Sequence, residues 1–360
     1  MGYTSSQMFS APPSPAAACQ GDVYREADTR VEQFVSFHGF QLFVREQGSG
    51  HPLLLINGLG GNLEMWGPTQ ERLSRNARTI AFDAPGMGRS RTTPVVLPLP
   101  AISWMLCRLL DRLDYHRVDV VGYSLGGIMA QQLARSAPER LRRLVLVGTS
   151  CGWGSAPPQA APLALISTPL RYLSKSFYRR TSHILDGGER FTRSELADAQ
   201  AAARNSHPPS MIGYAQQFLQ GSTWSSLHWA GNVSIPTLVI AGERDRLVPP
   251  ANGMLLAARL PNSRLHVLPG EGHLMLFDPD SASLPLLEDF FGCQLLGASR
   301  AWSDGAVVED SRAVERELKA APGAQPFKAM SGIYRGWVRG PIAQRVFARR
   351  DGGGQASGRT

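Results

Sequence analysis

A Gly-x-Ser-x-Gly pentapeptide, Gly122 to Gly126, joins the apolar stretch VDVV to the helix-like stretch GGIMAQQLAR. In this context the serine stands on a tight strand-to-helix turn that exposes its hydroxyl, and larger side chains would collide at the flanking glycines. The pattern recurs from Gly148 to Gly152. That copy runs into WGSAPPQAAP, which cannot begin a helix at once, so Ser150 is predicted to lie in a loop. Ser124 is therefore the predicted nucleophile of a strand-turn-helix unit.

Strand-like and helix-like stretches alternate on both sides of this turn. A hairpin is predicted to turn at Gly39. Other apolar stretches predict strands at 52–57, 78–85, 117–124, 141–148, 236–242 and 265–270, and helices at 102–114 and 126–140. Such alternation indicates an α/β fold with a doubly wound, mostly parallel sheet and helices on both faces.

The alternation stops in one internal region, where Pro-punctuated helical stretches take over. This interruption divides the 360-residue chain into an α/β core with a helical insertion and two flanking segments. The predicted segments are a flexible leader (1–32), the first part of the core (33–150), a helical cap or lid (151–233), the second part of the core (234–292) and a basic, flexible tail (293–360).

Composition excludes several classes of protein. Hydrophobic residues at 43% and charged residues at 18% exclude a wholly disordered chain. No stretch approaches the roughly 18 apolar residues of a membrane-spanning helix. The first twenty residues lack an early Lys or Arg and an apolar stretch, which argues against a secretory signal. Four scattered cysteines show neither a disulfide framework nor zinc-ligand spacing, so a cytoplasmic protein without a metal is predicted.

The positive charge is concentrated late in the chain. The net charge is +8, and residues 293–360 alone carry 11 Lys or Arg against 6 Asp or Glu, a local +5. The charge therefore belongs to the predicted tail, and no nucleic-acid partner is predicted.

A serine nucleophile needs an imidazole to take its proton and a carboxylate to orient that imidazole. Downstream of Ser124, the strand at 236–242 leads into Asp245 and the strand at 265–270 leads into His273. The chain order Ser, Asp, His is the one that this kind of turn uses. Asp83, in FDAPGMGRS, is instead predicted to hold a glycine-rich turn through backbone hydrogen bonds.

The tetrahedral intermediate of acyl transfer needs two donors aimed at its oxyanion. The amide of Leu125, directly after the nucleophile, is one candidate, and the amide of Leu59, in the glycine-rich loop after the strand at 52–57, is the other. The alternative for this loop is a phosphate-binding turn. Neither a Walker lysine nor dinucleotide-binding spacing accompanies it, so no cofactor is predicted.

Several motifs resemble those of the α/β-hydrolase superfamily, and in particular of intracellular medium-chain-length polyhydroxyalkanoate depolymerases. They are NGLGGNLEMW (57–66), GYSLGG (122–127), DGGERF (186–191), GYAQQFLQGSTWSSLHW (213–229) and GERDRLVP (242–249). The resemblance implies a triad of Ser124, Asp245 and His273 and a polyester of 3-hydroxy acids as substrate. It departs at Leu125, where the family usually has tryptophan.

Three residues outside the generic hydrolase pattern are candidate substrate contacts: Asn57, Trp224 and Trp229. The aromatic residues of the insertion would suit a cover over a hydrophobic acyl chain. The alternative is that most of them pack the core of the insertion itself.

The predicted tail combines basic and aromatic residues. Between Phe327 and Arg350 there are six Lys or Arg and no acidic residue, interleaved with apolar side chains. Such a segment can attach to an anionic membrane or a lipid-coated granule. Glycines and Pro341 interrupt any helix there, so an unstructured arginine-biased tail is the alternative.

These features predict a serine esterase that works through an acyl-enzyme on a hydrophobic ester or polyester. A carboxylesterase or lipase acting on small lipids would share every catalytic residue. The same residues are also compatible with an acyltransferase, or with a hydrolase-like binding protein that has no activity. Dehalogenases and epoxide hydrolases are disfavoured because they need a carboxylate at position 124, and polyester synthases because they use cysteine there.

Overall fold

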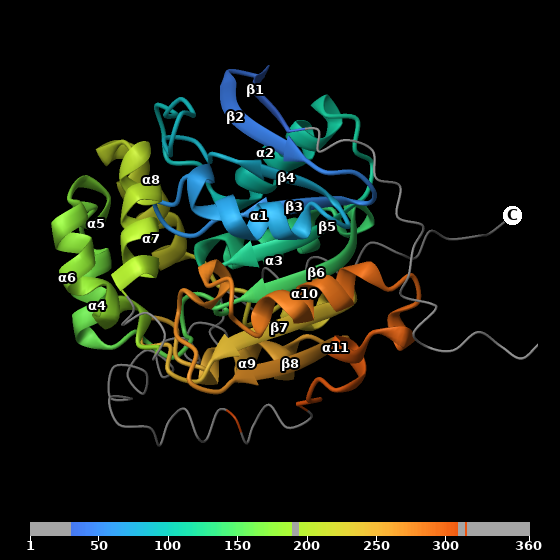
Figure 1. Ribbon diagram of the computed structural model, residues 1–360. Helices are drawn as coiled ribbons and strands as arrows, with labels where there is room; N and C mark the ends of the chain where they lie inside the picture. The colour runs from blue at the N-terminus through green and yellow to red at the C-terminus, as the bar shows by residue number, and fades with distance from the viewer. Residues whose placement is uncertain (1–29, 189–193, 309–313, 315–360) are drawn as a thin grey trace, which may run out of the picture.

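The computed structural model describes residues 30–188, 194–308 and 314, and its centre is one eight-stranded sheet (Figure 1). The spatial order of the strands is β1-β2-β4-β3-β5-β6-β7-β8. Their bounds are β1 (Val31–Phe37), β2 (Phe40–Gln47), β3 (Pro52–Ile56), β4 (Arg78–Phe82), β5 (Val118–Tyr123), β6 (Leu141–Val147), β7 (Thr237–Gly242) and β8 (Ser263–Leu268). From β4 to β8 all neighbouring strands are parallel, and the predicted α/β fold with a mostly parallel sheet is confirmed.

The N-terminal edge of the sheet is an antiparallel hairpin. Strands β1 and β2 pair in register from Val31 with Glu46 to Phe37 with Phe40. The two turn residues, His38 and Gly39, have φ of 45° and 83°. Two consecutive positive φ values are what a two-residue hairpin turn requires, and Gly39 adopts such a value without strain. The hairpin predicted from the sequence is therefore present.

Both faces of the central strands are buried, because successive side chains alternate between two hydrophobic clusters. In β3, Leu54 and Ile56 belong to one cluster and Leu53 and Leu55 to the other. This alternation explains why the sequence of β3 reads as a continuous apolar run.

Helices cover the two faces of the sheet. The helices α2 (Leu99–Arg112), α3 (Leu125–Ser136) and α9 (Ala251–Arg259) contribute to one cluster, and α1 (Gly67–Leu73), α10 (Ser283–Gly292) and α11 (Arg300–Ser303) to the other. Short 3-10 turns lie in the connections: η2 (Leu63–Trp66), η3 (Pro138–Arg140), η5 (Ala230–Asn232), η6 (Met275–Phe277) and η7 (Leu296–Ala298). Across the described ranges, no helix combines the length and the apolar character that crossing a bilayer requires.

A group of helices between β6 and β7 forms a cap beside the sheet (Figure 1). They are α4 (Ala160–Ile166), α5 (Leu170–Leu173), α6 (Lys175–Asp186), α7 (Ser194–Ser206) and α8 (Met211–Thr223). Two of them begin with a serine cap, because Ser174 Oγ accepts from the Phe177 amide at 3.2 Å and Ser210 Oγ accepts from the Gly213 amide at 2.9 Å. The insertion is helical, as the sequence predicts.

The predicted start of a flexible tail at residue 293 is wrong for the described part of that segment. Ser299 Oγ donates to Asp289 Oδ2 at 2.6 Å, and the main chain of Ala306 exchanges two hydrogen bonds of 2.9 Å with Leu265 of β8. Trp302 stacks on Phe290 of α10 with ring centroids 5.8 Å apart. Scattered glycines suggested disorder, but this aromatic and main-chain packing extends the core to residue 308. The predicted leader (1–32) ends too late, because Val31 and Glu32 already belong to β1, and its residues 1–29 lie outside the described residues. Of the predicted tail, residues 309–313 and 315–360 lie outside them as well.

Trp302→Ala tests whether this extension belongs to the folded core. Trp302 is 8% exposed, so its removal is expected to lower the free energy of unfolding by about 3 kcal/mol in urea titrations. The matched control is Leu295→Ala in the same segment, which is 69% exposed and should change the value by less than about 0.5 kcal/mol. A Trp302→Ala effect as small as that of the control would show that this packing does not stabilise the fold.

Candidate active site

Ser124 occupies the turn between β5 and α3 with a strained backbone. Its φ is 53°, a value that non-glycine residues rarely adopt. The turn lies so close to its neighbours that a Cβ on Gly126 would come 2.1 Å from the Ile56 carbonyl oxygen, and one on Gly122 would come 2.7 Å from the Ala130 Cβ. Glycine at both positions therefore permits the turn that lifts the Ser124 hydroxyl above the sheet.

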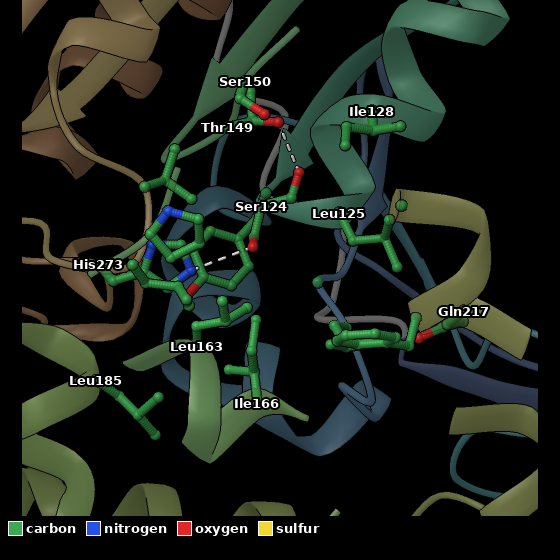
Figure 2. Close-up of a pocket in the computed structure, with 18 of the residues that line it drawn as sticks. Ser124, Leu125, Ile128, Thr149, Ser150, Leu163, Ile166, Leu185, Gln217 and His273 are labelled. Carbon is green, nitrogen blue, oxygen red and sulfur yellow. Dashed lines mark hydrogen bonds between the residues drawn. The ribbon is translucent and has the colours of Figure 1, made fainter. Parts of the chain in front are cut away.

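The structure brings the three predicted catalytic residues together. His273 Nε2 lies 3.1 Å from Ser124 Oγ, and His273 Nδ1 lies 2.7 Å from Asp245 Oδ2 (Figure 2 shows Ser124 and His273). The other carboxylate oxygen of Asp245 accepts from the amides of Leu247 at 2.9 Å and Val248 at 2.7 Å. An imidazole that donates from Nδ1 to this carboxylate accepts at Nε2, which is the arrangement that a general base for a serine requires.

A glycine directly after β6 makes room for this pair. Gly148 has φ of 53°, and a Cβ there would lie 3.3 Å from His273 Nδ1 and 3.6 Å from Asp245 Oδ2. Gly148 is also the first residue of the second Gly-x-Ser-x-Gly pattern.

The serine of that second pattern, Ser150, lies in a loop, as predicted, and its Oγ accepts from the Gly152 amide at 3.1 Å. Burial raises the pKa of the neighbouring Cys151 to about 12, so the thiol of this residue stays protonated near neutral pH.

The loop that carries His273 is anchored to the cap by Asp186, the last residue of α6. The Asp186 carbonyl accepts from the His273 amide at 2.9 Å. Its carboxylate accepts from the amides of Leu274 at 2.5 Å and Gly188 at 2.9 Å. Desolvation by burial raises the pKa of Asp186 to about 6, and the negative charge of Asp245 acts in the same direction. The hydrogen bonds from the two amides and the nearby His273 act in the opposite direction and lower this pKa.

The two predicted oxyanion donors line the same cavity as Ser124. Leu125 is the first residue of α3, and the amides of the first helical turn have no acceptor inside a helix. The carbonyl of Leu59 accepts from Tyr172 Oη at 2.6 Å and from Arg171 Nη2 at 3.2 Å. Gln217 Oε1 accepts from the next amide, Gly60, at 2.8 Å. The cap therefore fixes the single peptide unit that follows the predicted donor, the one between Leu59 and Gly60.

Asn57 holds the glycine-rich loop after β3 through its side chain. Its Oδ1 accepts from the Gly58 amide and its Nδ2 donates to the Asn62 carbonyl, both at 2.8 Å. Asn57 also belongs to the cavity lining, and its contact with substrate stays a prediction.

Asp83 holds its glycine-rich turn through backbone hydrogen bonds, as predicted, since its carboxylate accepts from the amides of Leu63 at 2.6 Å and Arg89 at 2.8 Å.

A cavity of about 330 Å³ lies over Ser124, between the sheet and the cap. Figure 2 shows Ile128, Leu163, Ile166 and Leu185 around Ser124 and His273. The volume falls in the range of small-molecule sites, and these side chains suit a hydrophobic ligand. Among the described residues, no three His, Cys, Asp or Glu side chains are grouped so that they could hold a metal ion.

Trp224 and Trp229 lie outside the cavity lining. Trp224 Nε1 donates to Gln132 Oε1 of α3 at 2.9 Å, and the two indole rings pack edge to face with centroids 5.5 Å apart. Arg135, also from α3, covers the Trp229 ring at 4.6 Å. Their contacts are with the core, which agrees with the alternative that the aromatic residues of this stretch pack internally.

Sequence reasoning missed several polar residues of the cap that reach the site: Arg171, Asp186, Arg204 and Gln217. DGGERF, which begins at Asp186, contributed to the resemblance but gave no role for the carboxylate. Gln217 lies in the 213–229 motif, which likewise gave it no role. Arg171 and Arg204 stand in helical stretches with no motif around them, so only the tertiary fold shows that they line the cavity.

Comparison with known proteins agrees with this geometry. Residues 51–280 match the model of the alpha/beta hydrolase fold family. The chain is 39% identical over 239 residues to a poly(3-hydroxyalkanoate) depolymerase of Ectopseudomonas oleovorans, covering 66% of this chain and 83% of that protein. It is 31% identical over 253 residues to a putative carbamate hydrolase RutD of Pseudomonas syringae pv. syringae, covering 67% and 91%.

Solved structures show the same architecture. A hydrolase from Pseudomonas aeruginosa PA01 superposes with a TM-score of 0.62 and 28% identity, covering 73% of this chain and 98% of that one. An enol-lactonase from Burkholderia xenovorans LB400 superposes with a TM-score of 0.63 at 23% identity, covering 72% and 99%. The chain belongs to the alpha/beta hydrolase family. Within this family of hydrolases it resembles poly(3-hydroxyalkanoate) depolymerase.

Asp186→Asn is expected to change how stability depends on pH. In the unfolded chain an aspartate titrates near pH 4, whereas the pKa of Asp186 in the folded protein is about 6. Between these values the folded state holds a proton that the unfolded state has lost. The contribution of Asp186 to the free energy of unfolding is therefore largest below pH 4 and is lost as pH rises through 6. Removing it should make the fall in unfolding free energy over this range shallower, by up to about 1.4 kcal/mol per pH unit.

Urea unfolding at pH 4, 5, 6 and 7 measures this slope. Asp198→Asn, which removes an exposed carboxylate of α7 that pairs with Arg179, serves as control and should keep the wild-type slope. If Asp186→Asn also keeps that slope, the raised pKa of Asp186 is contradicted.

Proposed function

We propose that this protein is a serine ester hydrolase, and specifically a poly(3-hydroxyalkanoate) depolymerase that works through an acyl-enzyme on Ser124. The observation that carries the proposal is the hydrogen-bonded series from Ser124 Oγ through His273 to Asp245, with distances of 3.1 and 2.7 Å, at the floor of an apolar cavity. The 39% identical depolymerase supports the choice of substrate class.

In the proposed reaction, Ser124 Oγ attacks the ester carbonyl while His273 Nε2 takes the hydroxyl proton. Asp245 orients the imidazole and stabilises the imidazolium that forms. The amides of Leu59 and Leu125 donate to the oxyanion of the tetrahedral intermediate. His273 then gives its proton to the departing alcohol, and a water molecule, activated by the same imidazole, releases the hydroxy acid from Ser124.

The shape of the site supports a hydrophobic acyl group. Leu163 and Ile166 of α4 and Leu185 of α6 face the same cavity as Ser124 (Figure 2). An aliphatic side chain of a medium-length hydroxy acid would gain about 0.8 kcal/mol for each methylene buried there. A carboxylesterase or lipase for small lipids, the closest alternative, would use the same catalytic residues on a different ester.

Hydrolysis of amorphous polyester granules tests the proposal. Wild-type protein should release hydroxy acid, with a preference for medium-length side chains, and Ser124→Ala should be at least about a thousandfold slower while keeping its circular dichroism spectrum. A soluble p-nitrophenyl ester serves as a second substrate. Cleavage of that ester without attack on any granule would favour the small-ester alternative, and an active Ser124→Ala would refute the serine mechanism.

We also propose that residues 327–350, which lie outside the described residues, attach the protein to its granule. The six basic residues and the interleaved aromatic residues of this stretch support the proposal. Deleting residues 315–360 leaves the packed segment around Trp302 in place, and it is expected to reduce co-sedimentation with polyester granules. Hydrolysis of a soluble ester checks that the shortened protein folds. Undiminished co-sedimentation would contradict the attachment.

A further inference from the structure

Two arginines of the cap, Arg171 of α5 and Arg204 of α7, line the cavity that contains Ser124. They are only 5% and 4% exposed. Burying a guanidinium removes it from water at a large free-energy cost unless an anion or several acceptors replace the water. Their surroundings therefore decide whether they have a structural or a binding role.

Aromatic rings provide most of the contacts of these arginines. The guanidinium of Arg171 lies over the rings of Tyr172 and Tyr214, at 4.9 and 5.5 Å. The guanidinium of Arg204 lies over the rings of Tyr172 and Tyr178, at 5.4 and 4.9 Å. Arg204 Nη1 also donates to Tyr172 Oη at 3.0 Å. Rings attract a cation but accept only part of its hydrogen-bonding capacity.

Both side chains retain donors without an acceptor. Within the described ranges, Arg171 Nη1 and Arg204 Nε have no hydrogen-bond partner, and neither guanidinium pairs with a carboxylate. The remaining groups close to them are neutral, since the Tyr178 hydroxyl lies next to Arg204 and the Tyr214 hydroxyl lies next to Arg171.

Arg45, which is equally buried, shows the contrast. Its guanidinium pairs with Glu32 at 2.6 Å and with Glu64 at 2.8 Å. The fold therefore supplies counter-ions to a buried arginine at the hairpin but not to the two at the cavity.

We propose that Arg171 and Arg204 form a subsite for a free carboxylate of the substrate. Guanidinium groups match the geometry of a carboxylate, and a buried position strengthens the attraction. The inference rests on the proposed ester hydrolysis and narrows it. In a chain of 3-hydroxy acids the only free carboxylate belongs to the terminal unit, so the enzyme is expected to prefer the last ester bond of the chain or a short oligomer.

The reaction at that bond follows from the position of the carboxylate. Ser124 Oγ bonds to the carbonyl carbon, and the bond from that carbon to the terminal hydroxy acid breaks. The oxygen of the departing unit takes the proton from His273, so a hydroxy acid leaves with its carboxylate held at the arginines. Water then releases the rest of the chain from Ser124.

Two dimers of 3-hydroxyoctanoic acid test the subsite. One has a free terminal carboxylate, and the other carries a neutral primary amide in its place. Wild-type kcat/KM, measured by chromatography of the released monomer, is expected to be at least tenfold higher for the acid than for the amide. Arg204→Gln and Arg171→Gln should each bring this ratio close to one. Arg179→Gln, which removes an exposed charge of the same cap, should keep the wild-type ratio.

A binding measurement on the wild-type protein covers the case in which the variants do not fold. Inhibition of p-nitrophenyl ester hydrolysis by 3-hydroxyoctanoate should be at least tenfold stronger than inhibition by 3-hydroxyoctanamide. Equal cleavage of the two dimers, or equal inhibition by acid and amide, would overturn the carboxylate subsite while leaving ester hydrolysis in place. Failure to cleave any of these esters would instead refute the proposed function itself.

Discussion

The close packing of the Ser124 turn against β3 is the constraint on which the rest of the site depends. Gly126 lies so close to the carbonyl oxygen of Ile56 that there is no room for a side chain at this position. This contact fixes the nucleophile relative to the loop after β3, and that loop supplies the Leu59 amide. The positive φ of Ser124 is a local strain that the surrounding sheet imposes, and it aims one hydroxyl at one imidazole.

The cap contributes to the site as well as covering it. Tyr172 and Arg171 hold the carbonyl of Leu59, and Gln217 holds the amide of Gly60. Asp186 holds the amides of His273 and Leu274. The glycine-rich loop after β3 and the loop that carries His273 are thus both hydrogen-bonded to helices of the insertion. A movement of the cap would therefore change the geometry of catalysis together with access to the cavity.

The three residues of the proposed triad could be predicted because they follow the ends of parallel strands, and those ends meet at one edge of the sheet. Periodicity, glycine patterns and chain order together were enough to select Ser124, Asp245 and His273. The contacts of Trp224 could not be predicted, because an aromatic residue packs equally well against a core and a ligand. The packing of Trp302 was also missed, since nearby glycines indicated disorder while Asp289 and Phe290 provided partners that only the fold reveals. Arg171 and Arg204 lacked any local signal, because the absence of counter-ions becomes visible only in three dimensions.

The most direct measurement of the central claim is mass spectrometry of the protein after reaction with a fluorophosphonate probe, which bonds to an activated serine. The account predicts one adduct, on the peptide that contains Ser124, and its loss in a folded His273→Ala variant. An adduct on Ser150 instead, or an unreactive Ser124 in the folded protein, would contradict it.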